Sequence, residues 1–299
     1  MKSGFVSIVG KPNVGKSTLL NMILREKVSI VSHKPQTTRF NILGILTLED
    51  AQIIFIDTPG IMKKAKNVLD KSLLKEAFSS LQDADVVVMV VEPTYPTEED
   101  LRVLEAVKQS GKPSILVINK IDTVRDKKEL LPIMEHYSRL HDFREFVPIS
   151  ALYRDGIDIL LDVIKKYLPE GELYFPEDQI TDKPLRILVA EIIREKIYQH
   201  YHEEIPYATA VHVEEFIDPE EHPEENRKKV YIRAIIYVER ESQKPIIIGE
   251  GGRKIKQLGM VARKDIEALL GKPVFLELHV KVKPKWRRNE GFIRSLNRI

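Results

Sequence analysis

The sequence contains no cysteine and only one tryptophan among its 299 residues. Without cysteine the chain can form neither a disulfide nor a metal site with thiolate ligands, and this composition suits either a reducing compartment or a thermophilic protein. No apolar stretch reaches the ~18 residues that a membrane-spanning helix needs, and no secretory leader is evident. We therefore expect a soluble, intracellular protein. At ~150 residues per domain, the length predicts about two domains.

The net charge of +2 is unevenly distributed along the chain. Residues 1–180 carry a net charge of −2, residues 181–226 carry −8, and residues 227–299 carry +12. A block as basic as the last one indicates a polyanionic partner. The alternative is a solvated surface that the preceding acidic stretch balances, and charge alone favours neither interpretation.

A phosphate-binding loop of the form GxxxxGKS lies near the N-terminus, as Gly10-Lys11-Pro12-Asn13-Val14-Gly15-Lys16-Ser17. It stands between a predicted buried strand, Phe5–Val9, and a predicted helix, Thr18–Leu24, which is the context that such a loop requires. Its glycines allow backbone N–H groups to point at a polyphosphate on the positive end of the helix. Lys16 is predicted to reach the β- and γ-phosphates, and the Ser17 hydroxyl to ligate Mg²⁺.

A second motif, Asn119-Lys120-Ile121-Asp122, follows the apolar strand Ser114–Ile118 and predicts that the base is guanine. A carboxylate at position 122 can accept hydrogen bonds from N1–H and the exocyclic amine of guanine, and adenine offers no matching pair of donors. Ser150-Ala151-Leu152 follows Phe146–Ile149 in the same way. The backbone N–H of Ala151 is predicted to meet the guanine O6.

Asp57-Thr58-Pro59-Gly60 ends the apolar run Ala51–Ile56 and predicts a sensor of the γ-phosphate. Asp57 can hold Mg²⁺ through water, and the Gly60 N–H can contact the γ-phosphate, so that loss of this phosphate frees the following segment. A threonine in Pro35-Gln36-Thr37-Thr38-Arg39 should close over the metal in the GTP state. We predict Thr38, with Thr37 as the alternative.

Together these motifs predict a site for GTP, GDP and Mg²⁺. Its hydrolytic residues are predicted to be Lys16, Thr38, Asp57 and Gly60, and its metal ligands Ser17, Thr38 and Asp57. The predicted nucleotide-binding residues are Gly10, Lys11, Pro12, Asn13, Val14, Gly15, Lys16, Ser17, Thr18, Asp57, Thr58, Pro59, Gly60, Asn119, Lys120, Asp122, Ser150, Ala151 and Leu152.

Residues 1–170 alternate apolar strands with helical stretches, the pattern of an α/β P-loop GTPase with a doubly wound, mostly parallel sheet. The helices are predicted over Val68–Leu81, Glu98–Lys108, Lys127–Leu140 and Ile157–Leu168. Asp85–Val91 is nearly all apolar, as a central parallel strand should be. We expect a GTPase domain over 1–170, a linker over 171–184 that is rich in proline and acidic residues, and a second domain over 185–299.

The second domain reads as α-β-β-α-α-β, with a glycine-rich loop near its middle. The helices are expected over Leu185–Tyr198 and up to Leu270, and the strands over Tyr207–Ile217, Lys229–Glu239 and Val274–Lys281. The order resembles an α+β K-homology (KH) domain of the bacterial type II topology. Such a domain clamps the backbone of about four single-stranded nucleotides with a GXXG loop.

The predicted RNA-binding residues lie in and next to this loop and in the basic tail. They are Ile248, Gly249, Glu250, Gly251, Gly252, Arg253, Lys254, Lys256, Lys283, Lys285, Trp286 and Arg287. Glu250 lies inside the loop where a basic residue is expected, so it should weaken nonspecific binding and leave more selectivity to base contacts. Trp286 is predicted to stack on a base, with anchoring of the tail to its domain as the equal alternative.

On these motifs the chain resembles the Era family of GTPases over essentially its whole length. The residue after Gly60 is Ile61, where Ras-like enzymes carry the glutamine that orients the attacking water, so we expect slow intrinsic hydrolysis. The resemblance implies that Asn13 helps to hold K⁺ beside the phosphates, and the alternative is that Asn13 is a turn residue. It also implies binding to the 3′ end of 16S ribosomal RNA, a role in assembly of the 30S subunit, and a cytoplasmic location with peripheral membrane contact.

The sequence therefore predicts a monomeric GTPase whose nucleotide state regulates an RNA-binding domain. Two alternatives remain open. In one, the nucleotide site is largely structural and the protein is chiefly an RNA-binding module. In the other, the switch acts on a membrane or protein partner and the basic tail meets anionic lipid.

Overall fold

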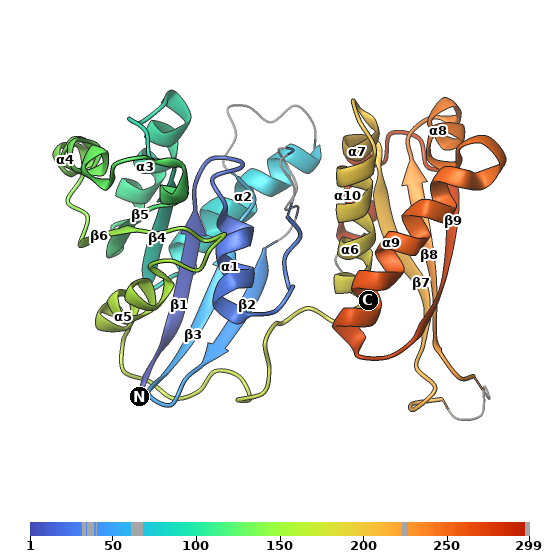
Figure 1. The fold of residues 1–299 in the computed structure, drawn as a ribbon, viewed down its shortest axis with the longest axis horizontal. Helices are drawn as coiled ribbons and strands as arrows, with labels where there is room; N and C mark the ends of the chain where they lie inside the picture. The colour runs from blue at the N-terminus through green and yellow to red at the C-terminus, as the bar shows by residue number, and fades with distance from the viewer. Residues whose placement is uncertain (32–33, 35–38, 40, 61–67, 223–226, 297–299) are drawn as a thin grey trace. The chain divides into compact units, whose positions relative to one another are not determined.

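The computed structural model describes residues 1–31, 34, 39, 41–60, 68–222 and 227–296, without the side chain of Ser72. These residues form two compact units, of which one lies within residues 1–66 and 70–182, and the other comprises residues from Lys183 onward together with Val68 and Leu69. Each unit has its own sheet and its own hydrophobic core (Figure 1). Among the described residues no helix is long and apolar enough to cross a membrane.

The first unit is built on a six-stranded sheet in the order β2-β3-β1-β4-β5-β6. Every neighbouring pair is parallel except β2 with β3, which is antiparallel. The strands are β1 (Lys2–Val9), β2 (Ile42–Thr47), β3 (Ala51–Asp57), β4 (Val86–Val91), β5 (Ser114–Ile118) and β6 (Glu145–Pro148). All six residues of β4 are buried, as expected for a parallel strand covered on both faces.

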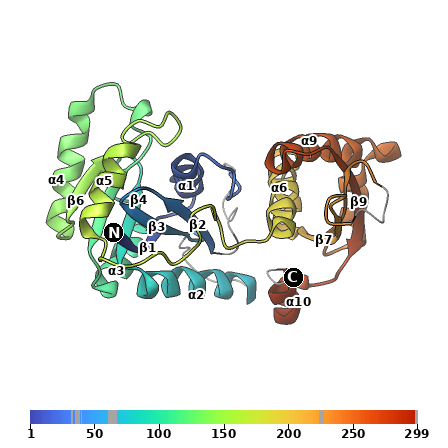
Figure 2. The ribbon, with the colours of Figure 1, turned by 90° about the horizontal axis from the view of Figure 1, so that it is seen from below.

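Helices cover both faces of this sheet, as Figure 2 also shows. On one face α1 (Lys16–Leu24) and α5 (Ile157–Tyr167) share a core with β1, β3 and β4. On the other face lie α2 (Val68–Asp83), α3 (Glu98–Ser110) and α4 (Leu130–Leu140). Because helices cover both faces of the sheet, side chains on both faces of each strand are buried. The strand sequences are therefore apolar at successive positions rather than at alternate ones.

Parallel pairing brings the four nucleotide motifs to one edge of the sheet. The phosphate loop follows β1, the segment from Thr58 follows β3, Asn119 follows β5, and Ser150 lies two residues after β6. Because these strands are parallel, their carboxyl ends lie at the same edge, where ligands of doubly wound sheets bind.

The segment after α5 is hydrogen-bonded to the first unit. The Gln52 side chain accepts from the N–H groups of Tyr174 (2.8 Å) and Phe175 (3.0 Å) and donates to the Phe175 carbonyl (2.8 Å). The Ile45 N–H donates to the carbonyl of Ile180 (2.9 Å). Much of the predicted linker is therefore fixed along β2 and β3, through contacts between residues over 100 positions apart.

The second unit is a three-stranded sheet in the order β7-β8-β9, antiparallel between β7 and β8 and parallel between β8 and β9. Its core contains residues of α6, α8 and α9. Its elements are α6 (Leu185–His200), α7 (Ile205–Ala208), β7 (Ala210–Ile217), β8 (Val230–Val238), α8 (Lys244–Ile248), α9 (Arg253–Leu270), β9 (Val274–Val282) and α10 (Glu290–Leu296).

Three details differ from the sequence analysis. The helix predicted from Lys127 begins at Leu130, because Asp126 caps a 3-10 turn over Lys127–Glu129 and Pro132 is tolerated only in the first turn of an α-helix. The strand predicted from Tyr207 begins at Ala210, because Pro206 favours the short helix α7. The sequence analysis named neither β2 nor α10. The predicted α/β class, a doubly wound, mostly parallel sheet followed by a smaller α+β unit, is confirmed.

Candidate functional site

The phosphate loop is a tight turn between β1 and α1 that depends on its glycines. Gly15 has a φ of 99°, and a Cβ there would come within 2.3 Å of the Asn119 side chain. A Cβ on Gly10 would come within 2.5 Å of the Val90 carbonyl oxygen. Asn13 also has a positive φ, of 67°, a conformation that asparagine tolerates better than most residues. The turn places the loop's N–H groups at the N-terminus of α1.

Lys16 is buried, with 6% of its surface exposed. Its ammonium group donates to the carbonyl oxygens of Gly10 (3.0 Å) and Lys11 (2.9 Å). Burial lowers the pKa of Lys16 to about 8, and the nearby Asp57 carboxylate opposes this shift. A buried ammonium with a lowered pKa gains strongly from an added negative charge, which a phosphate would supply.

Asp57 lies at the end of β3 and is fully buried. Its Oδ2 accepts from the hydroxyls of Ser17 (2.7 Å) and Ser29 (2.7 Å), whereas its Oδ1 has no hydrogen-bond partner among the described residues. Burial raises the pKa of Asp57, and the two hydroxyls and Lys16 act against that shift. Mg²⁺ prefers oxygen ligands and keeps several bound waters. The Ser17 hydroxyl, together with a carboxylate whose Oδ1 has no hydrogen-bond partner among the described residues, fits such an ion.

The segment after Asp57 lies against the phosphate loop. The Thr58 hydroxyl donates to the Ile8 carbonyl (2.8 Å), which ties the segment to β1. A Cβ on Gly60 would come within 2.9 Å of Pro12. The glycine therefore permits close approach of the two motifs predicted to contact phosphate.

The guanine motif is hydrogen-bonded to the phosphate loop. Asn119 donates to the Val14 carbonyl (2.8 Å), and its Oδ1 accepts from the Ala151 N–H (2.9 Å). Lys120 donates to the Asn13 carbonyl (2.8 Å). The Asp122 carboxylate is exposed and accepts from the Ser150 hydroxyl (2.5 Å). Asn119 is therefore hydrogen-bonded both to the phosphate loop and to the loop that contains Ala151, and it fixes the distance between them.

The Ala151 N–H has a protein partner in this structure, the Asn119 side chain. Its predicted contact with guanine O6 stays a prediction. Thr38, its alternative Thr37, and Ile61 lie outside the described residues.

Two acidic residues that the sequence analysis did not name, Asp100 and Glu92, contact the phosphate and guanine motifs. Asp100 accepts from the Lys11 ammonium (2.9 Å) while closing a capping box with Thr97 at the start of α3. Glu92, just after β4, accepts from Lys120 (2.5 Å). The Thr-x-x-Asp pattern predicts a helix start, but nothing local predicts its partner on the phosphate loop.

The glycine loop of the second unit joins α8 to α9. Gly249, Gly251 and Gly252 have φ values of 71°, 58° and 77°, a region that side chains disfavour. A Cβ on Gly249 would come within 2.7 Å of the Lys254 side chain, whereas nothing lies within 4 Å of one on Gly251 or Gly252. The loop therefore presents open backbone at the N-terminus of an 18-residue helix, a site suited to an anionic chain.

The charged residues of this loop are exposed. Glu250 and Arg253 expose 89% and 80% of their side chains, and they pair with each other at 3.3 Å. Lys254 and Lys256 are exposed as well. By pairing with Arg253, the Glu250 carboxylate offsets part of the positive charge at the loop.

Trp286 is the clearest correction to the predicted RNA-binding residues. It is fully buried, and its indole N–H donates to the Ala208 carbonyl (2.8 Å). A ring without an exposed face offers no platform for a base, so Trp286 anchors the tail, the alternative that the sequence left open. Arg287 pairs with Glu239, and the Lys283 ammonium lies 4.5 Å from the centre of the Phe292 ring. Lys285 is exposed.

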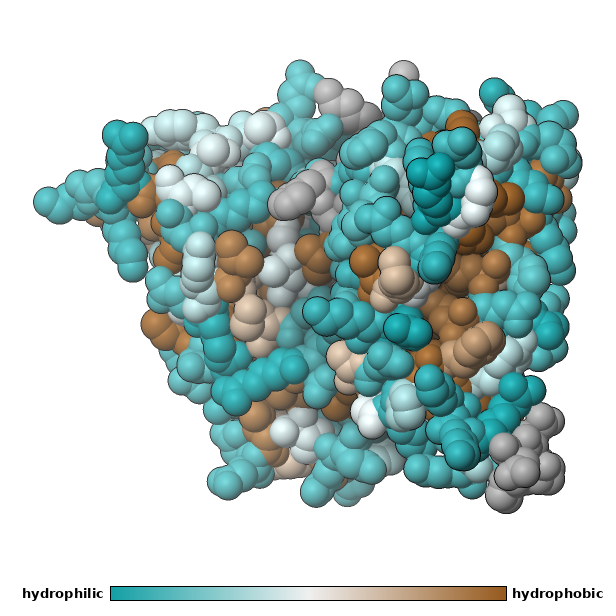
Figure 3. All heavy atoms as spheres, turned by 45° about the vertical axis from the view of Figure 1, so that its right-hand side comes forward, coloured by the Kyte–Doolittle hydropathy of each residue, from teal (hydrophilic) through white to brown (hydrophobic). Residues whose placement is uncertain are grey.

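Hydrophobic side chains gather on the face of the second unit that carries α8, α9 and β9, bordered by hydrophilic ones (Figure 3). Ile246 and Met260 expose 41% and 52% of their surface, and Ile248, Ile255 and Leu278 are half-buried. In a KH domain the glycine loop holds the sugar-phosphate backbone of the RNA, and the bases lie on an adjacent apolar surface. This surface would suit that arrangement.

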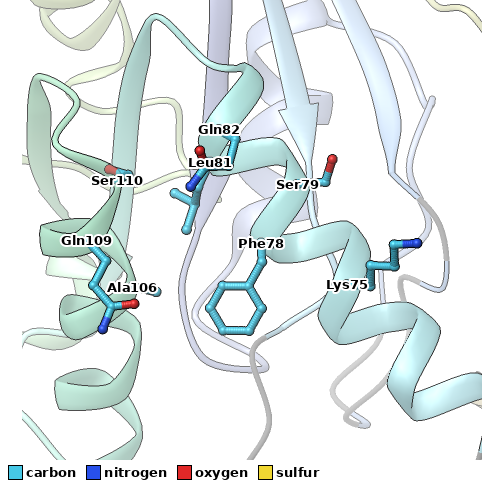
Figure 4. Close-up of a pocket in the computed structure, with 8 residues that line it drawn as sticks. All are labelled: Lys75, Phe78, Ser79, Leu81, Gln82, Ala106, Gln109 and Ser110. Atoms are coloured by element: carbon cyan, nitrogen blue, oxygen red, sulfur yellow. The ribbon is translucent and has the colours of Figure 1, made fainter.

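A shallow groove of about 410 Å³ lies elsewhere, between α2 and α3 (Figure 4). Phe78, which is 46% exposed, projects into it, and Lys75, Ser79, Gln82 and Gln109 are among its other lining residues. None of the predicted nucleotide- or RNA-binding residues lines it.

Known proteins resemble this chain along its whole length. A family model described as 50S ribosome-binding GTPase matches residues 5–120, and one described as KH domain matches residues 204–287. GTPase Era of Syntrophus aciditrophicus is 49% identical over 295 residues, which is 98% of this chain and 94% of that protein.

Two crystal structures of Era match with 46% identity over 99% of this chain. One is a variant from Aquifex aeolicus bound to GDP and AlF₄⁻, with 99% of that chain covered and a TM-score of 0.94. The other is a complex with MgGDPNP and nucleotides 1506–1542 of 16S ribosomal RNA, with 98% of that chain covered and a TM-score of 0.93. With such identity over almost all of both chains, and with both sites built as described, this chain belongs to the Era family of GTPases.

Proposed function

We propose that this GTPase uses its guanine-nucleotide state to regulate binding of single-stranded RNA. GTP is bound and hydrolysed within residues 1–170, RNA is bound within residues 185–299, and residues 171–184 connect the two functions. The observation that carries the proposal is that each unit has a glycine loop at a helix N-terminus, one at Gly15 and one at Gly252, which supports separate binding of nucleotide and RNA.

In the nucleotide site, Ser17 and Asp57 would hold Mg²⁺, and Thr38 would join them in the GTP state. When bound, Mg²⁺ neutralises charge on the β- and γ-phosphates. The unmatched Oδ1 of Asp57 supports this assignment, as does the MgGDPNP in the similar Era complex. Lys16 would bind the same phosphates, and Gly60 would contact the γ-phosphate through its N–H.

The base would be selected by Asp122, which is exposed at the sheet edge and positioned by the Ser150 hydroxyl. Asn119 and Lys120 would hold the phosphate loop and the base loop at the right separation. Asn13 would help to place K⁺ beside the phosphates. With no glutamine after Gly60, intrinsic hydrolysis would be slow.

The RNA would be the 3′ end of 16S ribosomal RNA, and the process assembly of the 30S subunit. Support comes from the similar Era structure in complex with nucleotides 1506–1542 of that RNA. Gly249 to Gly252 would clamp the backbone, with Arg253, Lys254 and Lys256 close to its phosphates. The protein would act as a monomer in the cytoplasm, with peripheral contact to the membrane.

The test uses fluorescence anisotropy to measure binding of the full chain to an RNA of nucleotides 1506–1542. It is carried out with GDPNP, with GDP and without nucleotide. We expect affinity to depend on the nucleotide and to exceed that for an unrelated RNA of equal length. Equal affinity in all three states would favour an RNA-binding module with a structural nucleotide site. Absence of RNA binding, together with salt-sensitive binding to anionic liposomes, would favour a membrane partner.

A further inference from the structure

Ser29 belongs to none of the nucleotide motifs, yet its side chain reaches the metal-binding carboxylate. It lies in the segment that follows α1, and only 1% of its surface is exposed. Its hydroxyl donates to Asp57 Oδ2 at 2.7 Å, the same distance and the same oxygen as the Ser17 hydroxyl.

Asn21 of α1 fixes the position of Ser29. The Asn21 Oδ1 accepts from the backbone N–H groups of Val28 (3.1 Å) and Ser29 (2.9 Å), and its Nδ2 donates to the Ser29 carbonyl (2.6 Å). Asn21 lies four residues after Ser17, so both side chains project from the same face of the helix. The helix that carries Ser17 therefore also aims the Ser29 hydroxyl.

The two carboxylate oxygens of Asp57 differ in their hydrogen bonding. Oδ2 receives both hydroxyls, whereas Oδ1 has no hydrogen-bond partner among the described residues. Ser29 and Asp57 are both buried, with 1% and 0% of their surface exposed. The carboxylate is thus held through one oxygen, and the other is left to face a ligand.

We propose that Ser29 is a positioning residue for Mg²⁺, acting through Asp57. The Ser17 hydroxyl would serve both the cation and Asp57, whereas the Ser29 hydroxyl serves Asp57 alone. Ser29 would therefore keep the carboxylate oriented when the cation is bound, and would leave Oδ1 available to that site. The inference rests on the proposed placement of Mg²⁺ beside Asp57.

The test measures release of fluorescent GDP from the full-length protein over a range of free Mg²⁺, from excess EDTA to millimolar. In Ser29→Ala we expect the half-saturating Mg²⁺ concentration to rise roughly tenfold or more, the factor expected when a hydrogen bond to a charged group is lost. The release rate in EDTA should stay within about twofold of wild type, because Ser29 faces the carboxylate and not the nucleotide. Ser29→Thr, which keeps the hydroxyl, should restore the wild-type Mg²⁺ dependence.

Ser7→Ala is the matched control. Ser7 is a fully buried serine of β1 whose hydroxyl lies 2.9 Å from that of Ser80, away from the metal site. It should lose stability without any change in Mg²⁺ dependence. If Ser29→Ala does not fold, Asn21→Ala takes its place, because it releases the backbone of Ser29 and should shift the Mg²⁺ dependence in the same direction.

Asp57→Asn separates failure of the inference from failure of the metal site. If Asp57→Asn alters the Mg²⁺ dependence and Ser29→Ala does not, the metal site stands and the positioning role of Ser29 is wrong. If Asp57→Asn leaves the dependence unchanged, the metal is not held at Asp57 and both proposals fall. If threonine does not restore the Mg²⁺ dependence, Asn21→Ala decides: a wild-type Mg²⁺ dependence in Asn21→Ala would overturn the positioning role of Ser29.

Discussion

The two anion sites of this protein share a glycine loop but differ in what supports it. In the nucleotide site the loop is held by buried side chains that bond to each other across the first unit, such as Lys11 with Asp100 and Ser29 with Asp57. The glycine loop of the second unit is exposed backbone, with open space beside Gly251 and Gly252. The first site should therefore fail when a side chain is removed, and the second when one is added.

Asp122→Asn should have the largest effect, because it alters the polar group predicted to select the base. We expect GDP affinity to fall by roughly 10³-fold, less than the roughly 10⁴–10⁵-fold seen when buried hydrogen-bonding groups are mismatched, because Asp122 lies exposed at the sheet edge. Affinity for xanthosine diphosphate should rise, because an amide at this position complements the altered purine edge. Competition binding measures both.

Asp126→Asn, in the same loop, is the control and should leave the nucleotide preference unchanged. Unchanged preference in Asp122→Asn as well would contradict the predicted guanine site.

Trp286→Ala should destabilise the second unit while sparing the first. Truncating a fully buried tryptophan costs about 3–5 kcal/mol. Urea denaturation followed by circular dichroism should show an earlier transition, whereas nucleotide affinity should stay as in wild type. Trp286→Phe keeps much of the packing and should keep most of the RNA affinity. A large loss of RNA affinity in a stable Trp286→Phe protein would restore the base-stacking role that burial argues against.

Gly251→Asp tests the prediction that the second site fails through addition. Aspartate and asparagine both tolerate the left-handed conformation, and neither meets an obstacle at this position. The added charge should repel a phosphate backbone and weaken RNA binding by about fivefold in a filter-binding assay, in line with ~1 kcal/mol for one unfavourable charge at close range.

Gly251→Asn has nearly the same shape without the charge, and it should lose much less affinity. Equal losses in the two variants would show that the loop is sensitive to bulk and not to charge.

The smallest effect is expected from pH, acting on the first unit through His141. Burial, with the charge of Lys108, lowers the pKa of His141, whose ring nitrogen lies 2.9 Å from the Ser114 hydroxyl. The unfolded chain therefore takes up the proton first as pH falls through ~6.5, and stability decreases. When the pH is lowered from 7.5 to 5.5, the protection factors of the β5 amides, which are corrected for the intrinsic exchange rate, should fall more in wild type than in His141→Gln. An identical fall in the variant would remove His141 from this pH response.

Much of the nucleotide site was predictable because its motifs are local. A phosphate loop is a backbone shape, and glycine spacing with a flanking strand and helix specifies that shape within about twenty residues. The same holds for the glycine loop between α8 and α9. Strand boundaries were predicted nearly as well, because parallel strands that are buried on both faces have continuous apolar runs.

The side chains that support these motifs were not predictable in this way. Asp100 lies 89 residues from Lys11, and Ala208 lies 78 residues from Trp286. A buried polar pair is recognisable only when both members are placed, since each residue alone looks like a helix cap or a surface charge. For this reason the sequence left the role of Trp286 open, and burial decided it.

The amino-acid sequence by itself determined the chemistry of this protein: the phosphate loop, the guanine motif, the glycine loop and the basic block are all readable in order along the chain. Only the tertiary structure decided which side chains hold those motifs in place, as Ser29 does for Asp57. The physical reason is that backbone conformations are encoded by neighbouring residues, whereas hydrogen bonds between distant residues exist only after the sheet has brought them together.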